Sequence, residues 1–88
     1  MLRIHHRRDS SGSLLLLEGK LLAPWANEVR IAAASALTQG RLRLDLAALT
    51  FADAEGVATL RSLRNAGIEF VHVSGVIGDL LASSGSAE

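Results

Sequence analysis

Leucines and charged residues alternate strictly from Arg41 to Leu46, which is typical of a half-buried β-strand. The three leucines of this stretch face one side, and its two arginines and its aspartate face the other. A parallel strand that is covered on both faces has a continuous apolar run instead. We therefore expect a sheet that helices cover mainly on one face.

Three further strands are expected. Leu2 to Arg7 alternates, and the apolar run Ser13 to Gly19 follows the turn-forming cluster Asp9 to Gly12. These two stretches predict an antiparallel hairpin. The last strand is predicted at Ile68 to Val73.

A first helix is predicted to begin at Ala23-Pro24-Trp25. Proline suits the first helical position, because the N–H that it lacks would be unpaired there. Apolar residues then recur at helical spacing, and Glu28 is expected in the first turn, where the helix dipole favours a carboxylate. Gln39-Gly40 is predicted to end the helix, since glycine takes the left-handed conformation easily.

A second helix is predicted after Asp53, which is expected to be its N-cap. Its buried stripe contains Val57, Leu60 and Leu63. Glu55, Thr59 and Ser62 are expected on an exposed polar face. Gly67 stops this helix, and Val76 to Leu81 predict a short closing helix.

The predicted order is β-β-α-β-α-β-α, a small single-domain α/β fold with a mixed four-stranded sheet and right-handed crossovers. The domain is expected to span residues 1–82, and residues 83–88, rich in Ser, Gly and Ala, are expected to form a flexible tail. The chain has 88 residues, of which 49% are hydrophobic, enough for one small core.

Charge and cysteine content exclude several function classes. Nine basic residues balance nine acidic ones, so no overall charge attracts nucleic acid or an anionic membrane. Cysteine is absent, which excludes disulfides and cysteine metal sites. The longest apolar run, Leu14 to Leu17, is too short to span a bilayer, and no signal peptide is evident, so a cytoplasmic location is expected. His5 and His6 are adjacent and would point to opposite faces of a strand, so no metal site is expected.

The start of the chain is locally basic. Arg3 to Arg8 contains three arginines and two histidines and predicts either a small binding patch or a solvated edge strand. An exposed edge would also permit pairing with a second copy, so a homodimer stays open.

Several segments together resemble one known family. They are Leu17 to Leu21, Leu44 to Asp53, Gly56 opening a helix that contains Leu60, and Gly67 to Phe70. Their order and spacing resemble the STAS domain, which is shared by sulphate transporters and anti-sigma-factor antagonists. The resemblance covers residues 14–81 and implies a STAS-like, SpoIIAA-like fold and a protein-binding role.

Two positions depart from the pattern that the family shows. In the antagonists the turn usually contains a serine that a partner kinase phosphorylates, and here Ala54 and Glu55 stand in its place. The family often has an aspartate near that turn, where this chain has Leu22. No phosphorylation is therefore expected. Glu55 is either a fixed mimic of phosphoserine or only a favourable first-turn residue.

The turn Asp53 to Gly56 is the predicted functional site, because ligands and partners of open α/β folds dock where strands end and helices begin. Gly56 is expected to let a partner approach the backbone. Thr59 and Ser62 extend this surface along the helix. The predicted partner-binding residues are Asp53, Ala54, Glu55, Gly56, Thr59, Ser62 and Leu22.

No nucleophile, histidine or oxyanion cradle accompanies these carboxylates, so we expect no enzyme activity, cofactor or metal. The resemblance implies a kinase-like anti-sigma factor as the partner. One alternative is an accessory subunit that binds the ATPase of an ABC transporter of the phospholipid type. The other is nucleotide binding, although Gly75 to Gly78 lacks a phosphate-binding pattern. Direct nucleic-acid binding and membrane insertion are not expected.

Overall fold

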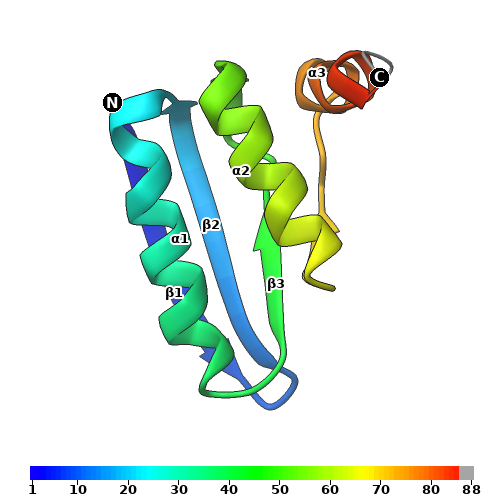
Figure 1. Ribbon diagram of the computed structural model, residues 1–88. Helices are drawn as coiled ribbons and strands as arrows, with labels where there is room; N and C mark the ends of the chain where they lie inside the picture. The colour runs from blue at the N-terminus through cyan, green and yellow to red at the C-terminus, as the bar shows by residue number, and fades with distance from the viewer. Residues whose placement is uncertain (86–88) are drawn as a thin grey trace.

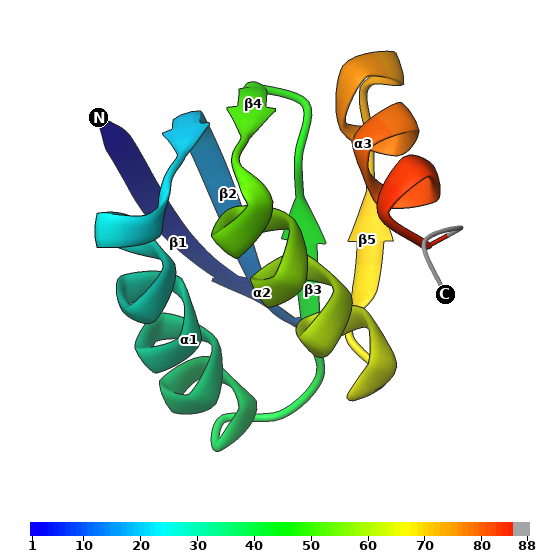
Figure 2. The same ribbon diagram turned by 45° about the horizontal axis from the view of Figure 1, so that its top comes forward.

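The computed structural model describes residues 1–85 as a five-stranded sheet with three helices (Figures 1 and 2). The order is ββαββαβα, one strand more than the sequence pattern predicts. The elements are β1 (Leu2–Asp9), β2 (Gly12–Leu21), α1 (Ala23–Leu37), β3 (Leu42–Asp45), β4 (Leu49–Ala52), α2 (Ala54–Asn65), β5 (Glu69–Val71) and α3 (Gly75–Gly85).

The sheet is mixed, as predicted, and follows the order β1-β2-β3-β5, with β4 also paired to β2. The β1–β2 hairpin is antiparallel, and β3, β4 and β5 run parallel to their neighbours. The prediction of four strands is wrong because β2 is long enough to pair with two short strands in succession. Ser13 to Leu16 pair with β3, and Gly19 to Leu21 pair with β4.

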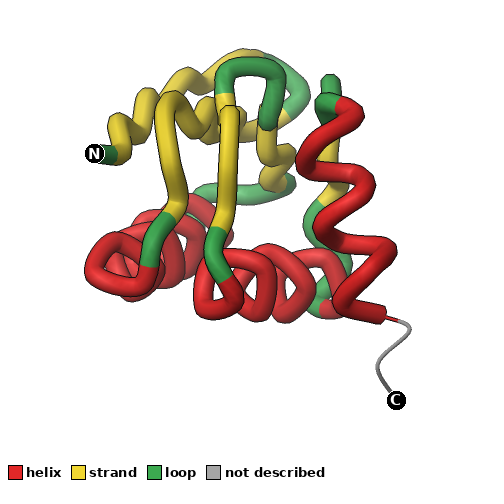
Figure 3. Tube along the Cα trace, turned by 90° about the horizontal axis from the view of Figure 1, so that it is seen from above, coloured by secondary structure: helices red, strands yellow, loops and turns green. Residues whose placement is uncertain are grey.

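The helices cover one face of the sheet, as the alternation of the third strand predicts. Figure 3 shows α1 and α2 together under the sheet and α3 beside its β5 end. Helix α3 contacts β4 and α2. Among the described residues, no helix combines the length and apolar character that crossing a bilayer requires.

The core lies between the sheet and the helices. The three leucines of the alternating stretch are at most 3% exposed. Burying an aliphatic side chain of this size stabilises a fold by about 1.5–3 kcal/mol. Further core side chains come from every other element of the fold except β5: Leu2, Leu15, Leu17, Leu21, Val29, Leu49, Leu60, Ile77 and Leu81.

Helix boundaries agree with the sequence signals at most ends. Pro24 is in the first turn of α1, and Gly40 takes a positive φ of 122° beyond its end. Glu28 is not in the first turn, because α1 already begins at Ala23. Helix α3 continues through Gly85, so its last three residues overlap the segment predicted as a tail. Residues 86–88, the rest of the predicted tail, lie outside the described residues.

Candidate protein-binding site

Asp53 joins the beginnings of two helices. One carboxylate oxygen, Oδ1, accepts a hydrogen bond from the Gly56 N–H at 2.8 Å, which confirms Asp53 as the N-cap of α2. The other oxygen, Oδ2, accepts from the Ala23 N–H at 2.8 Å, at the first residue of α1. Both are backbone donors that lack a partner within their own helix. The half-buried carboxylate thus serves the fold itself.

Gly56 has no room for a side chain. A Cβ atom placed on it would lie 2.3 Å from the Leu21 carbonyl oxygen and 3.2 Å from the Ala52 Cβ. Glycine therefore lets the first turn of α2 pack directly on the end of β2. The prediction that Gly56 admits a partner is wrong, because its backbone is buried within the domain.

Thr59 is fully buried, at 0% exposure, and its hydroxyl donates to the Glu55 carbonyl oxygen at 3.0 Å. The sequence pattern places it on the exposed polar face, and that prediction is wrong. Helix α2 contacts α1 and α3 as well as β4 (Figure 2), so more than one side of it is covered. Thr59 cannot contact a partner directly, and its hydroxyl satisfies a backbone acceptor of its own helix.

Ala54, Glu55 and Ser62 remain exposed, and Leu22 is half-buried at the N-cap of α1. We call these four residues the α2 surface. Glu55 is in the first turn of α2 and has no basic side chain within 4 Å among the described residues. The α2 surface thus presents one unpaired carboxylate among small and apolar groups.

Phe51 is an exposed aromatic side chain that sequence reasoning did not select. It lies on β4, two residues before the Asp53 cap, and 41% of it is exposed. The only sequence signal was an aromatic residue next to the turn. Large exposed aromatic side chains are frequent at protein interfaces, so Phe51 extends the possible contact area beyond the α2 surface.

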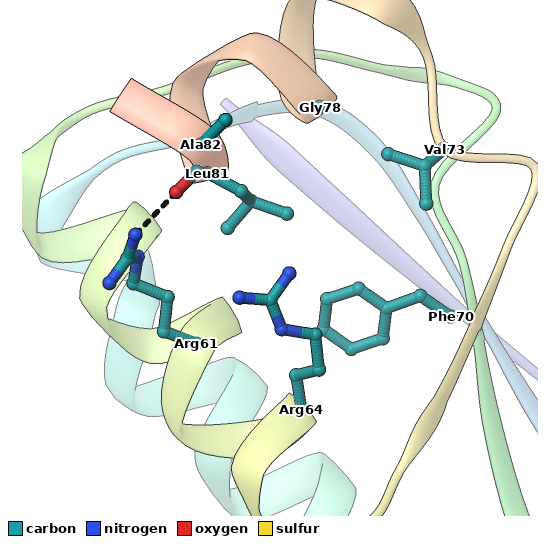
Figure 4. A pocket seen from close by; sticks show the side chains of 7 residues that line it. All are labelled: Arg61, Arg64, Phe70, Val73, Gly78, Leu81 and Ala82. Carbon is teal, nitrogen blue, oxygen red and sulfur yellow. Dashed lines mark hydrogen bonds between the residues drawn. The ribbon is translucent and has the colours of Figure 1, made fainter. Parts of the chain in front are cut away.

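A groove of about 370 Å³ lies between α2, β5 and α3, away from the predicted turn (Figure 4). The Arg61 Nη2 donates to the Leu81 carbonyl oxygen and so ties α3 to α2. Figure 4 shows the Arg64 guanidinium directed into the space between Leu81 and Phe70. Sequence reasoning missed this groove, because its lining residues come from three elements that only the fold brings together.

Metal ligands are not gathered anywhere in residues 1–85: no group of three or more His, Asp or Glu side chains is placed to hold a metal ion. His5 bonds to Glu18 at 2.9 Å, and His72 lies 3.2 Å from Asp45. Each histidine of these pairs faces a single carboxylate.

This arrangement of strands, helices and turn is a STAS-like fold, as the sequence resemblance implies. The chain is similar to the solved structure of the anti-sigma factor antagonist SpoIIAA in its unphosphorylated form. The TM-score is 0.68 and the sequence identity 16%, over 94% of this chain and 81% of that chain. No protein-family model and no curated protein sequence matches the chain. The likeness to SpoIIAA establishes the fold.

Proposed function

We propose that this chain is a non-catalytic protein-interaction module, similar in role to an anti-sigma-factor antagonist, that binds its partner through the α2 surface. The observation that supports this proposal most strongly is the exposed start of α2, where Ala54 and Glu55 project from a turn that Asp53 holds in place. A rigid, preformed surface lowers the entropic cost of association.

The charge on the α2 surface is fixed in this proposal. Glu55 stands where the resemblance puts the phosphorylated serine, and no hydroxyl is present at residues 54 or 55. A phosphoserine would carry more negative charge and one more acceptor oxygen than glutamate. Both groups are favoured at a helix N-terminus. The turn at residues 54 and 55 therefore stays in one electrostatic state and has no serine switch.

A photo-crosslinking experiment in the native cell extract tests the location of the interface. A benzophenone amino acid replaces Ala54 in one variant and the exposed Ala34, near the other end of α1, in the control. The variant at residue 54 is expected to capture a protein that the control does not. The proposal fails when both positions capture the same proteins.

The identity of the captured protein separates two versions of the proposal. A kinase-like anti-sigma factor supports the antagonist role, because SpoIIAA, which shares this fold, is an anti-sigma factor antagonist. The ATPase subunit of an ABC transporter supports the alternative role of accessory subunit.

Glu55 substitutions then test the contribution of the charge to affinity for the purified partner. Glu55→Ala is expected to weaken binding by about fivefold, the effect of roughly 1 kcal/mol. Glu55→Ser is expected to weaken it similarly, because serine is uncharged. Glu28→Ala, which removes another exposed carboxylate from α1, is the matched control. Unchanged affinity in both Glu55 variants contradicts the role of the charge.

Nucleotide binding stays a second candidate because of the groove beside α3. Arg64 supplies a cation and Phe70 an aromatic ring, two groups that commonly contact phosphates and bases. Titration with a fluorescent nucleotide is expected to saturate if the groove binds it, and Arg64→Gln is expected to abolish that signal. The absence of saturable binding ends this alternative.

A further inference from the structure

Within residues 1–85, strand β1 leaves one long edge of the sheet without a partner strand. It lies at the end of the strand order, and all eight of its residues pair in register with β2 on its other side. Unpaired backbone N–H and C=O groups on such an edge form a template for another strand. A hollow of about 390 Å³ lies along this strand, lined by His5, His6, Arg7 and Leu16.

The residues that offer backbone groups at this edge follow from the hydrogen-bond alternation. The Lys20 N–H donates to the Met1 carbonyl oxygen at 3.2 Å, so Met1 directs its groups toward β2. Neighbouring residues of a strand direct theirs to opposite sides. Ile4, His6 and Arg8 therefore present their N–H and C=O groups outward, at the free edge.

The side chains along this edge are predominantly cationic. Arg3, Arg7 and Arg8 are exposed and have no carboxylate within 4 Å among the described residues. Glu18, which is opposite Arg3 in the register, bonds to His5 instead. The acid of β1 itself, Asp9, lies 3.6 Å from Arg43 on another strand. Three positive charges are thus uncompensated beside a row of free backbone groups.

This charge pattern disfavours a second copy of the same strand. If two β1 strands paired antiparallel about His5, Arg3 of each copy would be directly opposite Arg7 of the other. Like charges that are directly opposite each other in adjacent strands destabilise this register. Shifting the centre to His6 would place Arg7 opposite His5, Ile4 opposite Arg8, and Arg3 opposite Asp9, whose carboxylate already bonds to Ser11 and lies 3.6 Å from Arg43.

We infer that the β1 edge binds an extended acidic segment of another protein, which adds to the sheet as a further strand. Its backbone pairs with Ile4, His6 and Arg8. Two of its carboxylates, four residues apart, lie beside Arg3 and Arg7 on the open face of the sheet. Strand addition of this kind takes affinity from main-chain hydrogen bonds and selectivity from alternate side chains. The site is separate from the α2 surface, so this inference does not depend on the proposed function.

Two blocked peptides of alternating sequence, one of valine and glutamate and one of valine and lysine, test the inference. The isotope-labelled full chain is titrated with each peptide and followed by NMR. The acidic peptide is expected to bind saturably, to shift the amide signals of Ile4, His6 and Arg8 most, and to bind more weakly as salt increases. The basic peptide is expected not to bind. Equal binding of both peptides, or shifts centred away from β1, overturns the inference.

Substitutions at His6 separate strand pairing from simple charge attraction. His6→Pro removes one outward N–H while leaving the β1–β2 hydrogen bonds, as edge strands tolerate. It is expected to weaken binding of the acidic peptide by at least about tenfold. The control His6→Ala keeps the N–H, and its affinity for the peptide is expected to stay within about twofold of that of the unmodified chain. Retention of the amide spectrum shows that His6→Pro is folded. Unchanged affinity in folded His6→Pro overturns strand addition.

A charge-reversed chain provides a second route if His6→Pro does not fold. The double variant Arg3→Glu with Arg7→Glu is expected to show no binding of the acidic peptide and to bind the basic peptide. Sedimentation of the unmodified chain is expected to show no dimer that depends on this edge. If the unmodified chain forms a concentration-dependent dimer and the double variant does not, the edge binds a second copy, and the inference of an acidic segment is wrong.

Discussion

Removing the Asp53 carboxylate is predicted to destabilise the domain more than the loss of an ordinary helix cap, because it holds two helices at once. Replacing an N-cap by alanine typically costs about 1 kcal/mol. Asp53 caps α2 through Gly56 and also accepts from Ala23 at the start of α1. Its negative charge adds roughly 0.3–1 kcal/mol at each helix N-terminus. The sum for Asp53→Ala is about 3 kcal/mol.

Urea denaturation followed by circular dichroism measures this loss as a lower midpoint with an unchanged slope. In a thermal melt, a loss of this size lowers Tm by roughly 12–24 °C for a domain of this length. Asp53→Asn is predicted to cost about half as much. Its oxygen still accepts from Gly56, but its amide group faces the Ala23 N–H as a second donor.

A double-mutant cycle isolates the bond to α1. Ala23→Pro removes the N–H that Oδ2 accepts, at a helical position where proline is tolerated. In that background, Asp53→Asn is predicted to cost about 1 kcal/mol less than in the unmodified chain. The reasoning is refuted if Asp53→Ala stays within about 0.5 kcal/mol of the unmodified chain, or if the two substitutions show no coupling.

Two further predictions concern the turn at Gly56 and the hairpin of β1 and β2. Gly56→Ala is predicted to lower the free energy of unfolding by about 1–3 kcal/mol, because its Cβ would overlap the Leu21 carbonyl oxygen. Gly78→Ala is the control on helix α3, where the nearest atom to the added Cβ is 3.9 Å away, and it is predicted to be neutral or stabilising. Denaturation of both variants measures the difference. Hydrogen bonds from the Ser11 hydroxyl and N–H hold the pKa of Asp9 below its usual value. Stability from this exposed group is therefore present near neutral pH and falls as acid protonates it below about pH 4. Acid titration of the hairpin amides by NMR is predicted to show this change, and Asp9→Asn is predicted to abolish it.

The strands with clear alternation of apolar and polar residues, and the helices with apolar residues at helical spacing, could be predicted from the sequence. Strand β4 could not. Leu49–Ala52 contains two consecutive exposed residues between buried ends, so it shows no alternation. It is a strand because the end of β2 extends past β3 and offers it hydrogen-bonding partners. Pairing of this kind depends on how far each strand extends in three dimensions.

The local structure of the candidate site was predictable only in part. The N-cap at Asp53 follows from its place before a helix, and the structure confirms it. The exposed face predicted for Thr59 assumes a single buried stripe on α2. Helix α2 also contacts α1 and α3, so its buried surface is wider than one stripe. The second bond of Asp53 depends on α1, thirty residues away in sequence.

In the proposed function, stability and recognition depend on different residues of one short turn. Asp53 and Gly56 direct their bonds and their packing into the domain, and Glu55 directs its charge to solvent. Asp53→Asn is expected to lower the unfolding free energy while the folded fraction keeps its affinity for the partner. Glu55→Ala is expected to lower the affinity without lowering the unfolding free energy by more than the loss of one helix-dipole interaction. If the two variants changed both quantities in parallel, the turn would act as one unit, and the assignment of binding to Glu55 would fail.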